Sequence, residues 1–263
     1  MTRVMGVVNV TPDSFSEGGA FGDPAAAIAH ARRLVAEGAD LIDVGGESTR
    51  PGSEPVPEQV ELDRVVPVIE ALAGTIGGTE ISVDTTKPAV AIAAVAAGAT
   101  VINDVSASLE AVAADQGVGW VAMHSLGPSA TMQDDPRYDD VVEEIASFLE
   151  DAVARGRSTG VERMWVDPGI GFGKTTVHNL ELVANLDRFT AIAPVLIGVS
   201  RKRFVGELHA VSDGIAGETP VTPADDRYEG SVAMATWSAH LGADIVRVHD
   251  VRGTVHAVRV VNS

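Results

Sequence analysis

The sequence predicts an α/β protein, a single (β/α)8 TIM barrel whose active site lies at the carboxyl ends of its strands. Eight short apolar runs are spread over almost the whole chain of 263 residues, segments of helical composition separate them, and each run ends in polar residues. A continuous apolar run is typical of a parallel strand that is buried on both faces. Because the carboxyl ends of parallel strands meet at one rim, these polar residues predict one functional site at that rim.

The eight expected strands are VMGVVN at 4–9, LIDVGGES at 41–48, ISVD at 81–84, VIND at 101–104, WVAMH at 120–124, MWVD at 164–167, VLIGVS at 195–200 and IVRVHD at 245–250. Helical composition is found at 24–37, 58–73, 88–97, 109–116, 139–157, 179–188, 230–241 and 253–261. The first of these helices has Asp23 as its expected N-cap and Pro24 at its first position. Four glycines follow helices and are expected to adopt the left-handed conformation: Gly38, Gly98, Gly117 and Gly242. The acidic, proline-containing stretch 209–228 is expected to be a surface loop.

Length and composition fit one domain, residues 1–263, since a barrel of this kind needs about 250 residues. Hydrophobic residues make up 45% of the chain, yet no stretch approaches the roughly 20 apolar residues of a membrane helix. The net charge of -18 argues against binding to nucleic acid or to an acidic membrane surface. With no signal-peptide pattern and no cysteine, the chain is expected to be cytoplasmic.

Three polar residues at strand ends form the first candidate site: Asp84, Asn103 and Asp167. Each follows apolar residues of a buried strand, so each is expected to point toward the mouth of the barrel. A buried carboxylate requires a hydrogen-bond donor, because otherwise it takes up a proton. Two carboxylates and an amide that converge on one cavity suit a flat, nitrogen-rich ring. The alternative is a set of structural caps and salt bridges.

Six basic residues of this acidic chain fall at or just beyond the ends of the second, seventh and eighth strands: Arg50, Arg201, Lys202, Arg203, Arg247 and His249. A positive rim indicates an anionic small molecule, and the last two strands of such barrels frequently hold phosphate. Arg247 and His249 are one residue apart, so both project to one side of a strand and could grip one phosphoryl group. Asn9 is either a turn residue or a neutral oxygen ligand for Mg2+, which takes few protein ligands.

The three lysines of the chain, Lys87, Lys174 and Lys202, each follow a strand end. Their placement is either an accident of a lysine-poor composition or a sign that an ammonium is required there. The chain contains no GxSxG elbow, no HExxH helix and no cysteine, so covalent catalysis and a structural zinc are poorly supported. The implied reaction is the departure of phosphate or diphosphate from a substrate with a polar heteroaromatic ring.

Motifs along the whole chain resemble the dihydropteroate synthase family of pterin-binding TIM barrels. In chain order they are NVTPDSFSEGG (9–19), VGGESTRPG (44–52), SVDTTKP (82–88), INDVS (102–106), MHS and MQDDPRY (123–138), DPGIGFGK (167–174), SRKRF (200–204), RYEGSVA (227–233) and RVHDV (247–251). Any one of these motifs is moderate evidence, but the ordered set is highly specific. The resemblance implies that (7,8-dihydropterin-6-yl)methyl diphosphate condenses with 4-aminobenzoate, giving 7,8-dihydropteroate and diphosphate in folate biosynthesis.

The resemblance also implies roles for individual residues. The pterin is expected to be held by Asp84, Asn103, Asp167 and Lys202, with Met123 and Phe172 as apolar walls. Mg2+ is expected at Asn9, and the diphosphate between Arg247 and His249. Thr49 is expected to take part in binding the pterin diphosphate. Asp84, Lys202, Arg247 and His249 are the expected catalytic residues. Aminobenzoate and the two loops around it are expected to involve Asp13, Ser14, Phe15, Thr49, Arg50, Pro51, Phe172 and Arg203.

The resemblance implies an SN1-like route, in which charge on the departing diphosphate is neutralised and the aryl amine attacks late, without a side-chain nucleophile. Ala107 stands where the family often has glycine, and His124 beside Met123 is expected to be structural. A homodimer is expected. Two alternatives stay open: a pterin-dependent methyltransferase domain, and a non-catalytic pterin-binding paralogue. The methyltransferase would not need the SRKR and RVHD motifs, and a paralogue would be expected to have lost TPDSF and STRPG.

Overall fold

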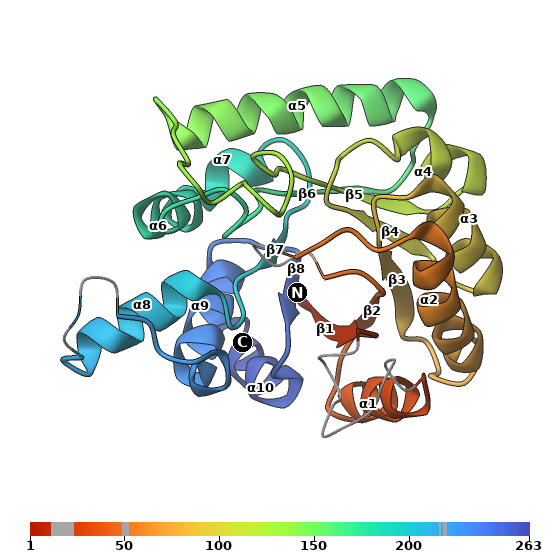
Figure 1. The fold of residues 1–263 in the computed structure, drawn as a ribbon, viewed down its shortest axis with the longest axis horizontal. Helices are drawn as coiled ribbons and strands as arrows, with labels where there is room; N and C mark the ends of the chain where they lie inside the picture. Colours follow the sequence, from red (N-terminus) through yellow and green to blue (C-terminus); the bar gives the residue numbers. More distant parts are fainter. Residues whose placement is uncertain (12–23, 49–52, 216, 218–219) are drawn as a thin grey trace.

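The computed structural model describes residues 1–11, 24–48, 53–215, 217 and 220–263. Its eight strands form one parallel sheet in the order β6-β5-β4-β3-β2-β1-β8-β7. The sheet closes between β6 and β7 through an isolated bridge from Val166 to Val195. Figure 1 shows the strands at the centre and the helices outside them. This arrangement is the predicted (β/α)8 barrel.

The strands are β1 (Arg3–Asn9), β2 (Leu41–Gly45), β3 (Glu80–Asp84), β4 (Val101–Asp104), β5 (Gly119–Met123), β6 (Met164–Asp167), β7 (Leu196–Gly198) and β8 (Ile245–Val248). The helices are α1 (Pro24–Ala36), α2 (Glu58–Leu72), α3 (Pro88–Ala97), α4 (Glu110–Gln116), α5 (Val141–Thr159), α6 (Thr176–Ala184), α7 (Leu186–Thr190), α8 (Arg203–Ser212), η2 (Ala224–Asp226), α9 (Tyr228–His240) and α10 (Val251–Val261). Each expected strand overlaps an observed one, but β2, β5, β7 and β8 end earlier than expected, because their last polar residues belong to the rim.

The four glycines expected to end helices all have positive φ angles, from 65° at Gly117 to 123° at Gly98. That conformation is easy for glycine and costly for residues with a Cβ atom, which explains the repeated glycine at these turns. The expected N-cap Asp23 lies outside the described residues.

Two expectations for the second half of the chain are corrected by the structure. The helix expected at 179–188 is two helices, α6 and α7, separated at Asn185. The stretch 209–228 was expected to be a loop, but residues 209–212 are the last turn of α8. Gly206 weakens the helical signal in this segment, and it stands where a Cβ atom would lie only 2.7 Å from the Thr222 carbonyl oxygen. The close contact with Thr222 therefore requires glycine at this position of α8, even though glycine weakens the helical signal.

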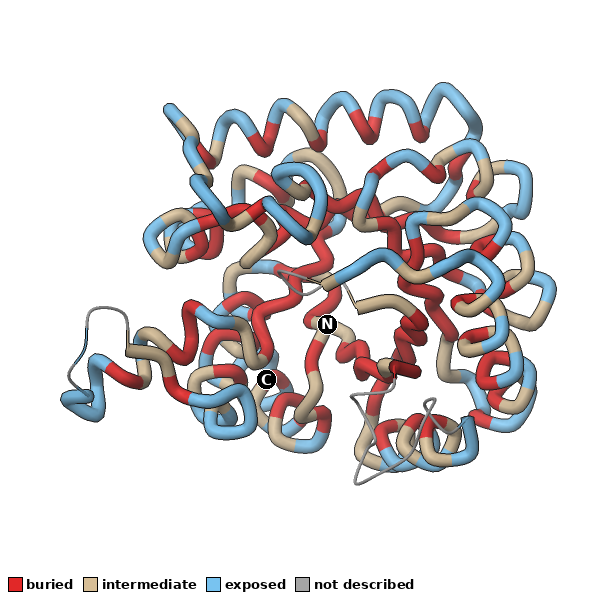
Figure 2. Tube along the Cα trace, in the orientation of Figure 1, coloured by how far each residue is buried: buried red, intermediate tan, exposed pale blue. Residues whose placement is uncertain are grey.

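The hydrophobic residues form two layers, one inside the barrel and one between the strands and the helices. The inner layer consists of Met5, Leu41, Val101, Val121, Trp165, Leu196 and Ile245, all buried. The larger outer layer joins the other strand faces to the inner faces of the helices, as the red segments of Figure 2 show. The inner layer fills the barrel below the rim, so only the carboxyl ends of the strands have room for a ligand.

The strand register places the predicted polar residues in one row. Asn9 pairs with Gly45, Gly45 with Asp84, and Asp84 with Asn103 across β1 to β4. Residues in register on neighbouring strands point to the same face of a sheet. Met5, a residue of the inner layer, pairs with Arg247 on β8 and therefore places Arg247 on the inside as well.

Candidate active site

Four polar residues inside the mouth of the barrel form an acidic cluster: Asp43, Asp84, Asn103 and Arg247. The Arg247 guanidinium donates from Nε to Asp43 Oδ2 (2.6 Å) and from Nη2 to Asp84 Oδ2 (2.7 Å). Asn103 Nδ2 donates to the same oxygen of Asp43 (3.0 Å). One cation thus serves two buried carboxylates that come from neighbouring strands.

Each of the three acceptor side chains in this cluster keeps one oxygen without a partner. Asp43 Oδ1, Asp84 Oδ1 and Asn103 Oδ1 are buried and accept no hydrogen bond from the described residues. Burial raises the pKa of Asp84 to about 7, against the lowering effect of Arg247. A buried acceptor without a donor is costly, so the cluster is suited to a ligand that brings N–H groups.

A lysine cluster lies at the carboxyl ends of β5 and β6 and in the loops after β6 and β7; it consists of His124, Asp167, Phe172, Lys174 and Lys202. Lys202 Nζ donates to the Ile170 carbonyl oxygen and lies 4.7 Å from the centroid of the Phe172 ring. Lys174 Nζ lies 3.0 Å from His124 Nδ1 and donates to the Phe172 carbonyl oxygen (2.9 Å). The two lysines therefore hold the loop that presents Phe172.

Burial shifts the pKa values of the ionisable side chains in the lysine cluster. Burial lowers the pKa of Lys174 to about 7 and that of Lys202 to about 8, while Asp167 opposes both shifts. Burial and the neighbouring Lys174 lower the pKa of His124 to about 3. His124 is therefore neutral at neutral pH, and its Nδ1 accepts from Lys174, in keeping with the structural role expected for it.

Two glycines leave space beside these clusters. A Cβ atom on Gly198 would lie 3.8 Å from both Lys202 Nζ and Arg247 Cβ, so the two clusters face each other across Gly198. A Cβ atom on Gly45 would lie 3.7 Å from Asn9 Oδ1 and 3.8 Å from Asp84 Oδ2. The rim therefore brings Asn9, the acidic cluster and Lys202 around one opening.

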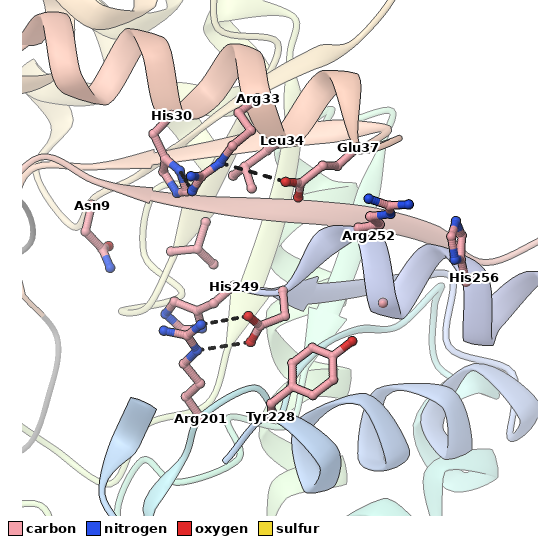
Figure 3. A pocket seen from close by; sticks show the side chains of 13 residues that line it. Asn9, His30, Arg33, Leu34, Glu37, Arg201, Tyr228, His249, Arg252 and His256 are labelled. Carbon is pink, nitrogen blue, oxygen red and sulfur yellow. Dashed lines mark hydrogen bonds and ion pairs between the residues drawn. The ribbon is translucent and has the colours of Figure 1, made fainter. Parts of the chain in front are cut away.

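A groove of about 710 Å³ opens beside this rim, between α1, β1, α9 and α10. At its rim end lie Asn9, His249 and Arg201 (Figure 3). Arg201 forms a two-pronged ion pair with Asp250, from Nε to Oδ2 (3.0 Å) and from Nη2 to Oδ1 (2.7 Å). His249 Nδ1 lies 3.1 Å from Ser200 Oγ. The rim end of the groove thus combines the neutral side chain of Asn9 and the imidazole of His249 with the Arg201–Asp250 ion pair.

The residues at this end fit Mg2+ only together with an anion. The described residues contain no group of three His, Cys, Asp or Glu that could hold a metal ion. Asn9 forms no side-chain hydrogen bond within the described part of the chain, so its Oδ1 is available as one neutral ligand. Mg2+ usually takes one or two protein ligands and completes its shell with phosphate oxygens and water.

The structure brings together most of the described residues that the sequence singles out. Met123 pairs in register with Asp167 and is buried beside the lysine cluster. The Arg203 side chain is exposed and forms an ion pair with Glu207 (2.8 Å). Arg247 is held by the two aspartates, whereas His249 lines the groove. Six expected residues lie outside the described residues: Asp13, Ser14, Phe15, Thr49, Arg50 and Pro51.

The sequence reasoning missed Asp43 and did not connect Lys174 with His124. A signal for Asp43 is present, since a charged residue interrupts the apolar run LIDVG. Each of the three lysines at the strand ends forms specific contacts in the structure. Lys87 Nζ lies 2.5 Å from both Glu47 Oε2, in the loop after β2, and Glu61 Oε2 on α2.

The fold and the site define a pterin-binding barrel enzyme, and the family model described as "Pterin binding enzyme" matches residues 5–249. Dihydropteroate synthase of Escherichia coli (strain K12) is 43% identical over 269 residues, which cover 99% of this chain and 91% of that protein. The Mycobacterium leprae enzyme is also 43% identical, with 99% and 93% coverage. The solved dihydropteroate synthase of Yersinia pestis, in a sulfonamide drug complex, has a TM-score of 0.89 and 43% identity, covering 99% of this chain and 93% of that one. The Xanthomonas albilineans enzyme with 4-aminobenzoic acid has a TM-score of 0.88 and 47% identity, with 98% and 91% coverage.

The chain belongs to the dihydropteroate synthase family. The resemblance seen in the motifs is thereby confirmed, together with the expected fold and the expected class of enzyme. The alternative of a pterin-dependent methyltransferase is not supported by these relatives. Among the helices that the structure describes, none is both long and apolar enough to cross a membrane.

Proposed function

We propose that this chain joins (7,8-dihydropterin-6-yl)methyl diphosphate to 4-aminobenzoate, and that the acidic cluster binds the pterin ring. The observation that carries the proposal is the set of buried oxygens without partners, Asp43 Oδ1, Asp84 Oδ1 and Asn103 Oδ1. A pterin presents several N–H donors along one edge. Such an edge supplies the missing donors, and it gains charge-assisted hydrogen bonds from a carboxylate.

The lysine cluster is proposed to bind the opposite side of the ring. Lys202 lies over the Phe172 ring and faces Arg247 across Gly198. Its ammonium can donate to the acceptor atoms of the pterin, while Asp167 supports the charge of the ammonium. Met123 and Phe172 provide apolar walls, so a flat ring is held by polar groups at its edges.

The leaving diphosphate is proposed to lie at the rim end of the groove. Asn9 would hold Mg2+, which when bound neutralises charge on the diphosphate oxygens. His249 and Arg201 line this position, and Arg247 keeps N–H groups that its two carboxylates do not use. These donors stabilise the charge that develops as the carbon–oxygen bond breaks.

The second substrate then attacks the methylene carbon without help from a side-chain nucleophile. The electron-rich pterin stabilises the cation left by the diphosphate, and the neutral amine forms the new carbon–nitrogen bond and releases a proton. A solved relative from Xanthomonas albilineans contains 4-aminobenzoic acid, which supports this choice of amine. The expected contacts of Asp13, Ser14, Phe15, Thr49, Arg50, Pro51 and Arg203 with this substrate remain proposals.

A homodimer and cytoplasmic residence also remain proposals. The outer faces of α9 and α10 expose the apolar side chains of Trp237, Val260 and Val261, with 40%, 75% and 39% of their surface accessible. A second copy of the chain that packs there would remove this apolar surface from water. Light scattering that gives the mass of one chain would contradict the dimer. The absence of cysteine fits a reducing compartment.

The proposed reaction is tested by release of diphosphate from purified protein with Mg2+. We expect release only when the pterin diphosphate and 4-aminobenzoate are both present, because the amine completes the reaction. Release that does not depend on 4-aminobenzoate would count against the proposal, and no release with either combination would favour the non-catalytic paralogue. As a matched pair, Asp84→Asn should abolish release and Asp63→Asn, at an exposed position of α2, should not.

A further inference from the structure

The groove between α1 and α10 extends well beyond the rim, and its outer part has no role in the reaction described above. One wall carries His30 and Arg33 of α1, and the opposite wall carries Arg252 and His256 of α10. Val7 and Leu34 also line it. Figure 3 shows Asn9 at the left end of this groove and His256 at the right end. The outer part is thus continuous with the proposed position of the leaving diphosphate.

The charge of the groove is opposite to that of the whole chain. The chain has a net charge of -18, whereas the groove is lined by three arginines against two carboxylates, together with three histidines. Burial and the neighbouring Arg33 lower the pKa of His30, so the positive charge of the groove comes from its arginines. Both carboxylates already have cationic partners: Asp250 pairs with Arg201 (2.7 Å), and Glu37 lies 3.8 Å from Arg33. Arg252 and His256 have no ion pair or hydrogen bond with any described side chain. A positive groove in an acidic protein concentrates small anions.

The spacing of the donors suits an anion with two charged groups. Arg252 and His256 are four residues apart on α10, and His30 and Arg33 are three residues apart on α1, so each pair is separated by one helical turn, about 5–6 Å between Cβ atoms. Arg33 donates to His30 Nδ1 (2.8 Å), which fixes the position of this pair. Tyr228 adds a phenolic hydroxyl to the lining. Arg33 on one wall and Arg252 and His256 on the other can contact both ends of a diphosphate, while His30 accepts from Arg33 and is hydrogen-bonded to the Val7 backbone.

We propose that the outer α1–α10 groove is a second binding site for diphosphate-class anions, through which product diphosphate leaves. This inference rests on the proposed function for the identity of the anion. The groove begins at Asn9 and His249, so diphosphate can move outward along it without passing over the pterin and the aminobenzoate. The outer site therefore separates the path of the leaving group from the opening used by the second substrate.

The site is tested by equilibrium dialysis of labelled inorganic diphosphate against the full chain, with Mg2+ present. We expect two bound anions per chain in the unaltered protein and one in the double variant Arg252→Ala/His256→Ala. Loss of these donors should weaken binding at the outer site by about tenfold or more. The matched control is Arg259→Ala, one turn further along α10 and outside the groove lining, which should keep both sites.

The result separates this inference from the proposed reaction. In the double variant, the initial rate without added diphosphate should stay unchanged, because neither residue lies at the reacting atoms. One anion per chain in the unaltered protein, or two in the double variant, would overturn the outer site. His249→Ala is expected to lose the inner anion and to keep the outer one. If His249→Ala keeps both anions and a normal rate, the proposed leaving-group position fails while the outer site stands.

Discussion

The acidic cluster and the lysine cluster lie on different strands of the same rim. Both contain buried ionisable groups, but carboxylates outnumber cations in the first and ammonium groups outnumber carboxylates in the second. In the acidic cluster, one guanidinium, that of Arg247, serves Asp43 and Asp84. In the lysine cluster, one carboxylate, that of Asp167, influences both Lys174 and Lys202. The first region therefore offers acceptors and the second offers donors. A ring with donors on one edge and acceptors on the other fits between them in one orientation only.

The stability of the acidic cluster is predicted to depend mainly on Arg247, the one cation that pairs with both of its aspartates. Arg247→Met should lower the free energy of unfolding at pH 8 by about 3–5 kcal/mol, because it leaves two buried carboxylates without their cation. Urea denaturation at pH 8 measures this loss. The matched control is Arg188→Ala, which removes exposed ion pairs with Glu143 and Glu150 and should leave the midpoint unchanged. A change in the urea midpoint for Arg247→Met as small as that for Arg188→Ala would show that the two aspartates do not need Arg247.

The two clusters are predicted to limit pterin affinity at opposite ends of the pH range. Burial raises the pKa of Asp84 to about 7, so its carboxylate is lost as the pH falls below about 7. Burial lowers the pKa of Lys202 to about 8, so its ammonium is lost as the pH rises above about 8. Affinity for a 7,8-dihydropterin, measured by calorimetry from pH 5.5 to pH 9.5, should therefore be greatest between these values.

Two variants test which group causes the loss of affinity on the acid side of that pH profile and which causes the loss on the alkaline side. Asp84→Asn should remove the acid limb and Lys202→Met the alkaline limb, each with a loss of affinity of about tenfold to hundredfold. Asp63→Asn is the control and should keep the whole profile. An acid limb that survives in Asp84→Asn would assign the titration to another group, and the contrast between the clusters would then be wrong.

The smallest predicted effect concerns the backbone beside the acidic cluster. Ala107 has a φ angle of 49°, whereas the loop of the lysine cluster uses glycines at its positive φ angles, Gly169, Gly171 and Gly173. The turn at Ala107 is held by Asp104, whose Oδ2 accepts from the N–H groups of Ser108 and Leu109 (2.7 Å each). Ala107→Gly should stabilise the protein by about 0.5 kcal/mol, because relief of the left-handed strain exceeds the added entropy of the unfolded chain. Thermal unfolding measures the change, and a lower midpoint would contradict it.

The sequence allowed the barrel to be predicted because its signals are local. The apolar runs that end in Asp84, Asn103 and Asp167 identify their strands without any knowledge of their neighbours. Helix α8 escaped prediction because Gly206 weakens its local signal and its packing against Thr222 is a long-range contact. The resemblance implies a contact of Arg203 with aminobenzoate, but its ion pair with Glu207, one turn away on α8, is a contact that no motif signals.

The sequence by itself determined the strands, most of the helices and the polar residues at the strand ends, since hydrophobic patterning and turn residues act over a few positions. Only the tertiary structure decided which of these side chains meet. Arg247 reaches Asp43 across 204 positions of the chain, and Lys174 reaches His124 across 50. These pairs depend on strand register and on closure of the barrel, which bring distant residues into a dry interior where their charges must be matched.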